Sequence, residues 1–313
     1  MNRILITGAN GFVGPHLVRA LDAAGDEVHG VGLGAPPAGV ALAGWHDFDL
    51  LEVTSLESAV NHVRPDFVVH LAGQSSAAAS FADPEGTFRI NVEGTRLLLD
   101  VVGRLVPRAR VLVVSSSDVY GPQPENTRVR EDAPCRPVSP YASSKAEAER
   151  LALARVHEAG ADVVVARAFG HTGPGQAERF VVPSFAQQIA AIEAGRADSL
   201  LHVGNLEVTR DLSDVRDVVR AYVTLLLRGR SGTVYNVCRG VGVRLTEVVA
   251  SLVAQARVPV RVETAPSRLR PTDVPWLVGD PALITRDTGW HAEIPLETTL
   301  RDVLEEWRAR TNP

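Results

Sequence analysis

One tyrosine and one lysine stand four residues apart in the stretch "SPYASSK", residues 139–145. Lys145 is the only lysine of the chain, because every other residue among the 32 lysines and arginines is an arginine. On a helix, Tyr141 and Lys145 would share one face. A free tyrosine has a pKa of about 10, but a nearby ammonium stabilises the phenolate and brings that pKa toward the working range. The pair is therefore predicted to transfer a proton.

Lysine suits this task better than arginine. Its charge is compact, and its three donors can serve two ribose hydroxyls while the ammonium faces the tyrosine. The chain has only 4 tyrosines among 313 residues, so chance rarely places a lone lysine at this spacing. An exposed helix lysine is the weaker interpretation.

Three serines end a strand-like run in "SSSDVYG". Ligands of open α/β folds bind at the carboxyl edge of the sheet. Ser115, Ser116 and Ser117 are therefore candidates for bonding a substrate carbonyl beside Tyr141. Plain turn residues are an equally common explanation of such a serine cluster.

The glycines of "GANGFVG" lie between the first strand-like run and the first helical pattern. In a dinucleotide-binding loop, such glycines allow a tight turn, a close approach of the backbone to a pyrophosphate, and close packing of helix on strand. Gly8, Gly11 and Gly14 therefore predict a dinucleotide phosphate site. A glycine-rich turn without a ligand is the alternative.

The type of dinucleotide is a separate question. NAD-binding folds usually carry an acid at the end of the second strand, but Gly32 stands there in "VHGVGLG". An uncharged site removes repulsion toward a 2′-phosphate, although no arginine lies between Arg19 and Arg64 to bind that phosphate. We expect NADP(H) as the preferred cofactor and NAD(H) as an alternative. Asp49 in "FDLLE" is a candidate for the adenine edge, or else an ordinary solvated aspartate.

These residues need a framework of alternating strands and helices. The strand-like runs "RILITG", "EVHGVGL", "DFVVHLAG", "RVLVVSSS" and "ADVVVARAF" alternate with helical patterns. Helices are expected over 12–24, over 84–104 and from Ser139 to Gly160. Repeated βα units with short connections predict an α/β fold with a Rossmann-type, doubly wound parallel sheet.

Two further structural expectations follow from the pattern along the chain. Thr54 and Glu57 have the spacing of a capping box at the start of a helix. The dinucleotide-binding domain is expected over residues 1–170. Residues 171–313 are expected to form mainly a smaller, partly interleaved substrate domain that returns some segments to the first.

Charge and cysteine content weigh against several classes of protein. A net charge of −5 and a pI near 6.0 give no electrostatic support for nucleic-acid binding. Cys135 and Cys238 are too few for a disulfide framework or a metal cluster, and they fit a reducing compartment. No signal-peptide pattern and no apolar run of about 18 residues is present. We therefore expect a cytoplasmic protein without metal or membrane partner.

The order of the glycine loop, the serine run and the Tyr-x-x-x-Lys motif resembles the extended short-chain dehydrogenase/reductase family. "HLAGQSS" and "INVEGT" are similar to its nucleotide-sugar-modifying branch. "HTGPGQ", "VGNLEVTRDLSDVRDVV" and "RPTDVPWLVGD" resemble GDP-4-keto-6-deoxy-D-mannose reductases and the related GDP-mannose 4,6-dehydratases. The resemblance covers nearly the whole chain.

The resemblance implies a role for each matching residue. Ser116 would be the catalytic hydroxyl, Tyr141 the general acid, and Lys145 the residue that binds the nicotinamide ribose. The implied cofactor-binding residues are Gly8, Asn10, Gly11, Phe12, Val13, Gly14, Asp49, Leu50, Leu71, Ala72, Gly73, Asn91, Ser115, Tyr141 and Lys145. The implied substrate-binding residues are Gln74, Ser116, Ser117, Tyr141, Gly170, Val181, Arg210, Arg270 and Asp273.

Three of these positions need comment. Arg210 and Arg270 would hold the nucleotide diphosphate by bidentate contacts, with surface charge as the alternative. Gly170 stands where the family often has an asparagine that helps hold the substrate phosphate, so that contact is not carried over.

Asp118 is a catalytic candidate at the position where dehydratases of this group carry a glutamate base. It is one methylene shorter, which favours plain reduction without excluding dehydration.

The resemblance implies NAD(P)H-dependent reduction of the C4 keto group of a nucleotide sugar, from GDP-4-keto-6-deoxy-D-mannose to GDP-D-rhamnose. The alternatives are a GDP-mannose 4,6-dehydratase or another nucleotide-sugar 4-epimerase or dehydratase. A non-catalytic nucleotide-binding sensor is an alternative from another class. The resemblance also implies a homodimer formed through helices near 92–104 and 142–158.

Overall fold

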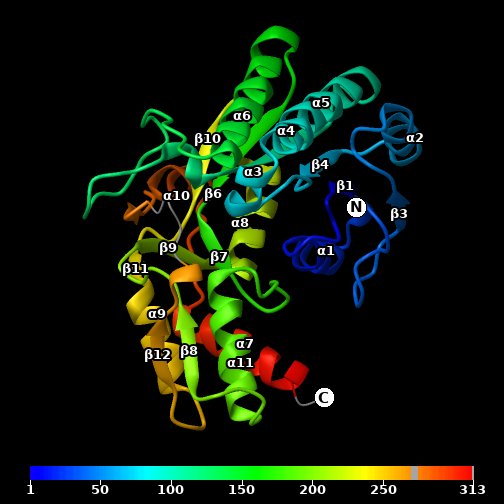
Figure 1. Ribbon diagram of the computed structural model, residues 1–313. Helices are drawn as coiled ribbons and strands as arrows, with labels where there is room; N and C mark the ends of the chain where they lie inside the picture. Colours follow the sequence, from blue (N-terminus) through cyan, green and yellow to red (C-terminus); the bar gives the residue numbers. More distant parts are fainter. Residues whose placement is uncertain (269–273, 312–313) are drawn as a thin grey trace.

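A seven-stranded parallel sheet forms the centre of the upper half of the molecule (Figure 1). The computed structural model describes residues 1–268 and 274–311. The strand order is β10-β6-β5-β4-β1-β2-β3, which confirms the Rossmann-type, doubly wound sheet. In chain order the strands are β1 (Arg3–Thr7), β2 (Glu27–Gly32), β3 (Gly44–Asp47), β4 (Phe67–His70), β5 (Arg110–Ser116), β6 (Val163–Ala168) and β10 (Val234–Val237).

Helices cover both faces of this sheet. One face carries α1 (Gly14–Ala23) and α8 (Val215–Arg228), and the other carries α2 (Val53–Val63), α5 (Gly94–Leu105) and α6 (Pro140–Ala159). Successive side chains of a strand point to opposite faces. In β1, Ile4 and Ile6 accordingly pack with α1 and α8, whereas Leu5 packs with α2 and α5. The sheet is therefore buried on both sides.

Helix α6 carries the tyrosine and the lysine, and its bounds confirm the expectation. The Ser139 side chain accepts a hydrogen bond from the Ala142 N–H (3.1 Å), Pro140 occupies the first turn, and Gly160 ends the helix at φ +65°. The helix expected over 84–104 forms as α4 (Pro84–Phe88), a π-helical turn η1 (Arg89–Glu93) and α5. The sequence did not predict this π-helical turn.

The capping box expected at Thr54 and Glu57 is wrong. Helix α2 begins at Val53, so its N-cap is Glu52, two residues before Thr54, and no side chain caps it. The start is set by the preceding turn, in which Asp49 accepts hydrogen bonds from the N–H groups of Leu51 (3.0 Å) and Glu52 (2.8 Å). Thr54 is therefore already inside the first turn of the helix.

A second lobe lies below the large sheet (Figure 1). Its core is enclosed by α7 (Val181–Glu193), α9 (Leu245–Ala254) and α11 (Leu296–Thr311). Its strands are β7 (Gly170–Thr172), β9 (Thr209–Asp214), β11 (Gly242–Arg244) and β13 (Trp276–Leu277) in one sheet, and β8 (Leu200–Val203) with β12 (Arg261–Thr264) in another. The remaining short elements of the described residues, in either half of the molecule, are α3 (Ala77–Ala82), η2 (Ser117–Tyr120), η3 (Pro266–Arg268) and α10 (Ala282–Thr288). Within the two described ranges, no helix is long and apolar enough to cross a lipid bilayer.

A buried ion pair joins the sheet to α6. Arg167 of β6 donates from Nε to the Glu149 carboxylate of α6 at 3.0 Å, and both side chains are only 6% exposed. The guanidinium also donates to the Glu131 carbonyl (3.1 Å) and lies 4.7 Å from the centre of the Tyr120 ring. This contact anchors the helix that carries Tyr141.

Removing one partner of this pair should be costly. Glu149→Leu leaves a buried guanidinium without its counter-ion, and we expect the free energy of unfolding to fall by about 3–5 kcal/mol in urea titrations. The double variant Glu149→Leu/Arg167→Met should lose less than the single variant. As a matched control, Glu147→Ala removes the exposed ion pair to Arg150 on the same helix, and should cost at most about 1 kcal/mol. A Glu149→Leu protein as stable as this control would contradict the prediction.

Candidate active site

The loop between β1 and α1 has room only for glycine at two positions. Gly8 has φ +70°, and a Cβ there would lie 2.7 Å from the Ala72 nitrogen. A Cβ on Gly14 would lie 1.9 Å from the Ala9 carbonyl oxygen. The loop backbone therefore packs directly against the end of β4 and against the first turn of α1. Such a cradle, with helix N–H groups at its base, suits a phosphate group.

Predicted cofactor residues from four parts of the chain meet at the carboxyl edge of the sheet. Leu71 and Ala72, which follow β4, lie against Gly8. A Cβ on Gly73 would lie 2.7 Å from Asn91 Oδ1 and 3.5 Å from Lys145 Nζ. The glycine loop, the segment after β4, the π-helical turn and α6 thus form one continuous site.

The catalytic candidates lie at the ends of β5 and α6. The Tyr141 side chain lies beside Ser116, which ends β5 and is buried. Ser116 Oγ also accepts a hydrogen bond from the Asp118 N–H at 3.2 Å. Ser115 and Ser117 are buried on either side. Tyr141 and Ser116 can therefore bond to one substrate oxygen together.

Burial dominates the electrostatics of this site. Burial raises the pKa of Tyr141, the negative charge of Asp118 raises it further, and the hydrogen bond to Ser116 opposes them. The Lys145 ammonium donates to the Val114 carbonyl at 2.9 Å, and burial lowers its pKa to about 8. Lys145 is not among the groups that shift the pKa of Tyr141 in this arrangement, so the expected lowering by Lys145 does not occur and desolvation of the phenol dominates. The phenol is protonated at neutral pH.

Asn91 lies in the π-helical turn and binds two neighbouring segments. Its Nδ2 donates to Ser144 Oγ (2.9 Å) and to the Gln74 carbonyl (3.1 Å), and its Oδ1 accepts the Gln74 N–H (2.8 Å). Ser144 in turn donates to the Tyr141 carbonyl at 2.8 Å. The Gln74 side chain donates to the Ser76 carbonyl and accepts a hydrogen bond from the Ser76 N–H. A π-helical turn often marks a functional site, and here it aims one asparagine at both the loop and α6.

A chain of hydrogen bonds lies beneath the site. The Ala72 N–H donates to Thr7 Oγ1 (3.3 Å), and the Thr7 hydroxyl donates to His70 Nδ1 (2.7 Å). His70 Nε2–H donates to Thr95 Oγ1 (2.9 Å), which donates to the Asn91 carbonyl (2.6 Å). Burial lowers the pKa of His70 to about 3, so the ring is neutral. The sequence analysis missed His70, although its place at the end of β4 in "HLAG" was a usable signal.

The remaining cofactor candidates also make contacts within the protein. Asn10 donates to the Leu33 carbonyl at 2.8 Å, and a Cβ on Gly32 would lie 2.4 Å from its Oδ1. Glycine at position 32 thus makes room for Asn10. Asp49 closes the turn before α2, and Leu50 packs in the core against Gly94. Phe12 and Val13 complete the glycine loop.

The described substrate candidates of the second lobe fall on three elements, β7, β9 and α7. Gly170 of β7 pairs with Leu212 of β9, and Arg210 of β9 donates to the Thr209 carbonyl at 2.9 Å. A Cβ on Gly170 would lie 2.9 Å from the Asp211 carbonyl oxygen, which gives a steric reason for glycine here. Val181 begins α7. Arg270 and Asp273 lie outside the described residues.

The single lysine allows its pKa to be measured directly. In protein labelled with 13C-lysine, the one Cε signal should titrate with a midpoint near pH 8, because burial disfavours the ammonium. The same signal in denaturing urea should return to about 10.4, the value of free lysine. A native midpoint at that higher value would show that Lys145 is solvated.

Comparisons with known proteins agree with this geometry. The family model described as GDP-mannose 4,6 dehydratase matches residues 5–303. The GDP-6-deoxy-D-mannose reductase of Pseudomonas aeruginosa is 38% identical, over 98% of both chains. The structure of the RMD protein of Pseudomonas aeruginosa complexed with NADPH is 37% identical with a TM-score of 0.89, over 99% of this chain and 100% of that one. The UDP-glucose 4-epimerase of Thermus thermophilus in complex with NAD is 30% identical with a TM-score of 0.87, over 98% and 99%. This chain belongs to the GDP-mannose 4,6 dehydratase family.

Proposed function

We propose that this protein is an NAD(P)H-dependent oxidoreductase that reduces the C4 keto group of a nucleotide sugar. The substrate we propose is GDP-4-keto-6-deoxy-D-mannose, and the product GDP-D-rhamnose. The observation that carries the proposal is the placement of Tyr141 beside Ser116, with half-buried Lys145 one turn further along α6. It occurs in a chain 38% identical to a GDP-6-deoxy-D-mannose reductase over 98% of both lengths.

The residues present fit a dinucleotide. The glycine loop forms a cradle that a Cβ would fill at Gly8 and Gly14, while Asn91 and Lys145 meet at Gly73 at the far end. NADP(H) is the preferred cofactor, in keeping with the NADPH complex of the related RMD protein. NAD(H) is the alternative, because the related epimerase binds NAD. When bound, the reduced nicotinamide supplies a hydride.

Tyr141 supplies the proton in this reaction. Its raised pKa keeps the phenol protonated at neutral pH, and an alkoxide that forms at sugar C4 is a far stronger base than a phenolate. The proton therefore moves from the Tyr141 hydroxyl to the C4 oxygen, and the phenolate left behind is stabilised by the Lys145 ammonium. Ser116 bonds to the same C4 oxygen and stabilises its charge as it develops.

Asp118 favours reduction over dehydration. Its charge raises the pKa of Tyr141, which keeps the phenol protonated, as a reduction requires. A reductase performs no elimination, so it does not need the longer side chain of a glutamate at this position. A GDP-mannose 4,6-dehydratase or a 4-epimerase remains the second candidate, because the matching family model carries the dehydratase description.

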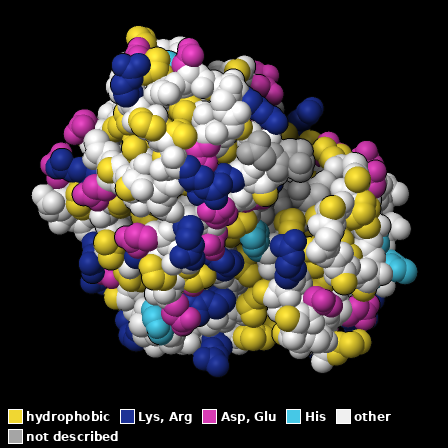
Figure 2. Space-filling view, turned by 90° about the horizontal axis from the view of Figure 1, so that it is seen from below, with side chains coloured by type: hydrophobic (Ala, Val, Ile, Leu, Met, Phe, Trp, Pro, Cys, Tyr) yellow, Lys and Arg dark blue, Asp and Glu magenta, His cyan; other side chains and the backbone are white. Residues whose placement is uncertain are grey.

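The second lobe is proposed to bind the nucleotide sugar, with residues 1–170 holding the dinucleotide. Figure 2 shows a hollow between two parts of the molecule, with Lys and Arg side chains gathered beside it. Nearly all of these are arginines, which suit a diphosphate. Arg210 and Arg270 are proposed to contact the diphosphate, and Ser117, Gln74 and Val181 to line the sugar site.

A cytoplasmic homodimer that pairs α5 and α6 completes the proposal. Its support is the resemblance to the family together with the cysteine content.

The first test follows absorbance of the reduced nicotinamide. Purified protein, NADPH and GDP-4-keto-6-deoxy-D-mannose should consume NADPH in stoichiometric amounts and form a new GDP-deoxyhexose, whose C4 configuration is read by NMR. Steady absorbance, together with a 4-keto product from GDP-mannose and NADP⁺, would identify a dehydratase. No product from either substrate would reject the GDP-sugar assignment.

Tyr141→Phe tests the proton donor. We expect kcat to fall by about 10²–10⁴-fold, because general acid catalysis is lost. Binding of NADPH, followed by fluorescence, should stay as in the wild type. The matched control is Tyr235→Phe. Tyr235 lies in the edge strand β10, and the variant removes a hydroxyl that donates a hydrogen bond to Asp287. Unchanged turnover in Tyr141→Phe would show that Tyr141 is not the proton donor, whereas NADPH binding without turnover in the wild type would support the nucleotide-binding sensor.

A further inference from the structure

The Phe12 ring connects the glycine loop to the second lobe. It is stacked on His171 of β7, with ring centres 6.0 Å apart and an angle of 8° between the planes. It also meets His16 of α1 edge-on, at 5.8 Å. Aromatic pairs at this separation attract each other beyond the effect of their buried area. Phe12 therefore contacts a strand of the second lobe while its own backbone belongs to the phosphate cradle.

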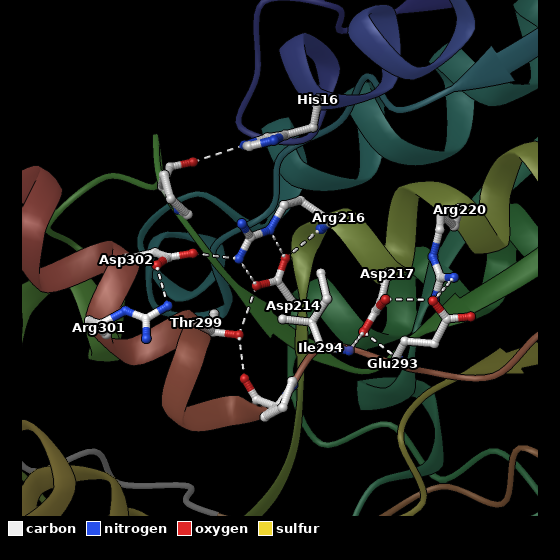
Figure 3. A network of polar contacts seen from close by, with 12 residues as sticks. His16, Asp214, Arg216, Asp217, Arg220, Glu293, Ile294, Thr299, Arg301 and Asp302 are labelled. Atoms are coloured by element: carbon white, nitrogen blue, oxygen red, sulfur yellow. Dashed lines mark hydrogen bonds and ion pairs between the residues drawn. The ribbon is translucent and has the colours of Figure 1, made fainter. Parts of the chain in front are cut away.

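A hydrogen bond reinforces this connection. His16 lies in the first turn of α1 and donates from Nε2 to the Pro174 carbonyl at 2.8 Å (Figure 3). Burial lowers the pKa of His16, so the ring at neutral pH is neutral, with its proton on Nε2. Gly175, at φ +93°, lets the chain turn beside the ring. We call Phe12, His16, His171 and the Pro174 carbonyl the interlobe clasp.

Further hydrogen bonds connect the clasp to the rest of the second lobe. The Gly175 N–H donates to Glu306 of α11 at 2.8 Å, and Gln176 accepts from Thr172 (2.8 Å) and donates to the His171 carbonyl (3.2 Å). The segment over 170–176 is thereby bonded to α11 at one end of the clasp and contacts α1 at the other. It begins at Gly170, which pairs with β9, the strand that carries Arg210.

A second set of contacts secures the same junction. Asp214, at the start of α8, accepts hydrogen bonds from Arg216 (2.8 and 2.7 Å) and from Thr299 of α11 (2.7 Å). Arg216 also reaches Asp302 of α11 at 2.8 Å (Figure 3). Helix α11 is thus tied both to α8 on the large sheet and to the clasp. A change at the glycine loop has a continuous path to the second lobe.

We propose that the interlobe clasp makes binding of the dinucleotide and of the nucleoside diphosphate cooperative, with His16 and Phe12 as positioning residues. A dinucleotide that orders the glycine loop also orders Phe12, and through it the segment over 170–176. A nucleoside diphosphate that then binds the second lobe loses less conformational entropy than it would alone. This inference rests on the proposed function only in assigning the dinucleotide to the glycine loop and the nucleoside diphosphate to the second lobe.

The test measures cooperativity without turnover. NADPH is titrated against the wild-type protein by fluorescence, with and without saturating GDP. We expect GDP to tighten NADPH binding at least about fivefold, the lower end of typical coupling between two sites. In His16→Leu, which removes the donor, and in Phe12→Leu, which removes the ring, this ratio should fall toward one. Because the readout is a ratio, uniformly weaker NADPH binding in a variant does not mimic the effect.

The matched control is Arg19→Gln, an exposed residue one turn further along α1. It should keep the wild-type ratio. Melting temperatures show whether each variant is folded, and the two clasp variants act through different contacts, so either one alone decides. No GDP effect in the wild type, or a full effect in a folded clasp variant, overturns the proposal. A protein that shows the cooperativity but no reductase turnover would instead reject the proposed function.

Discussion

A chain of hydrogen bonds that runs from Thr7 through His70 to Thr95 holds the active site together. It joins the ends of two strands to the π-helical turn, and each donor in it has one acceptor. The chain works only with a neutral His70, and burial ensures this by lowering its pKa to about 3. Because the group is buried, an unmatched donor or acceptor here would be costly. The positions of Asn91 and of the segment after β4 depend on it.

Burial also sets the protonation states of Tyr141 and Lys145, which lie above these hydrogen bonds. Desolvation raises the pKa of the Tyr141 phenol and lowers that of the Lys145 ammonium, so both shifts disfavour the charged form. A protonated phenol is the form a reduction needs at its start. The ammonium, close to its pKa near neutral pH, has charge available for the phenolate that the reaction leaves. One physical effect thus prepares a proton donor and the group that stabilises its conjugate base.

The two lobes are joined by contacts of different kinds on either side of α8. Ion pairs link α8 to α11, while a ring stack and one neutral hydrogen bond link the glycine loop to β7. Neither a ring stack nor a neutral hydrogen bond requires two charges to be desolvated, so such contacts can open and close at small cost. A reductase must release its oxidised cofactor in each cycle, and a junction of this kind is compatible with repeated opening.

Local patterns of period, glycine placement and helix capping were enough to predict the fold class, the glycine loop and the Tyr141–Lys145 pair. Ser139, Pro140 and Gly160 bounded α6 correctly for the same reason. Such patterns could not predict the pKa of Tyr141, the π-helical turn at Asn91 or the contact of His16 with Pro174, since desolvation and long-range contacts are absent from any local pattern. Thr54 failed as a cap because a turn at Asp49 starts α2 two residues earlier, with Glu52 as the N-cap.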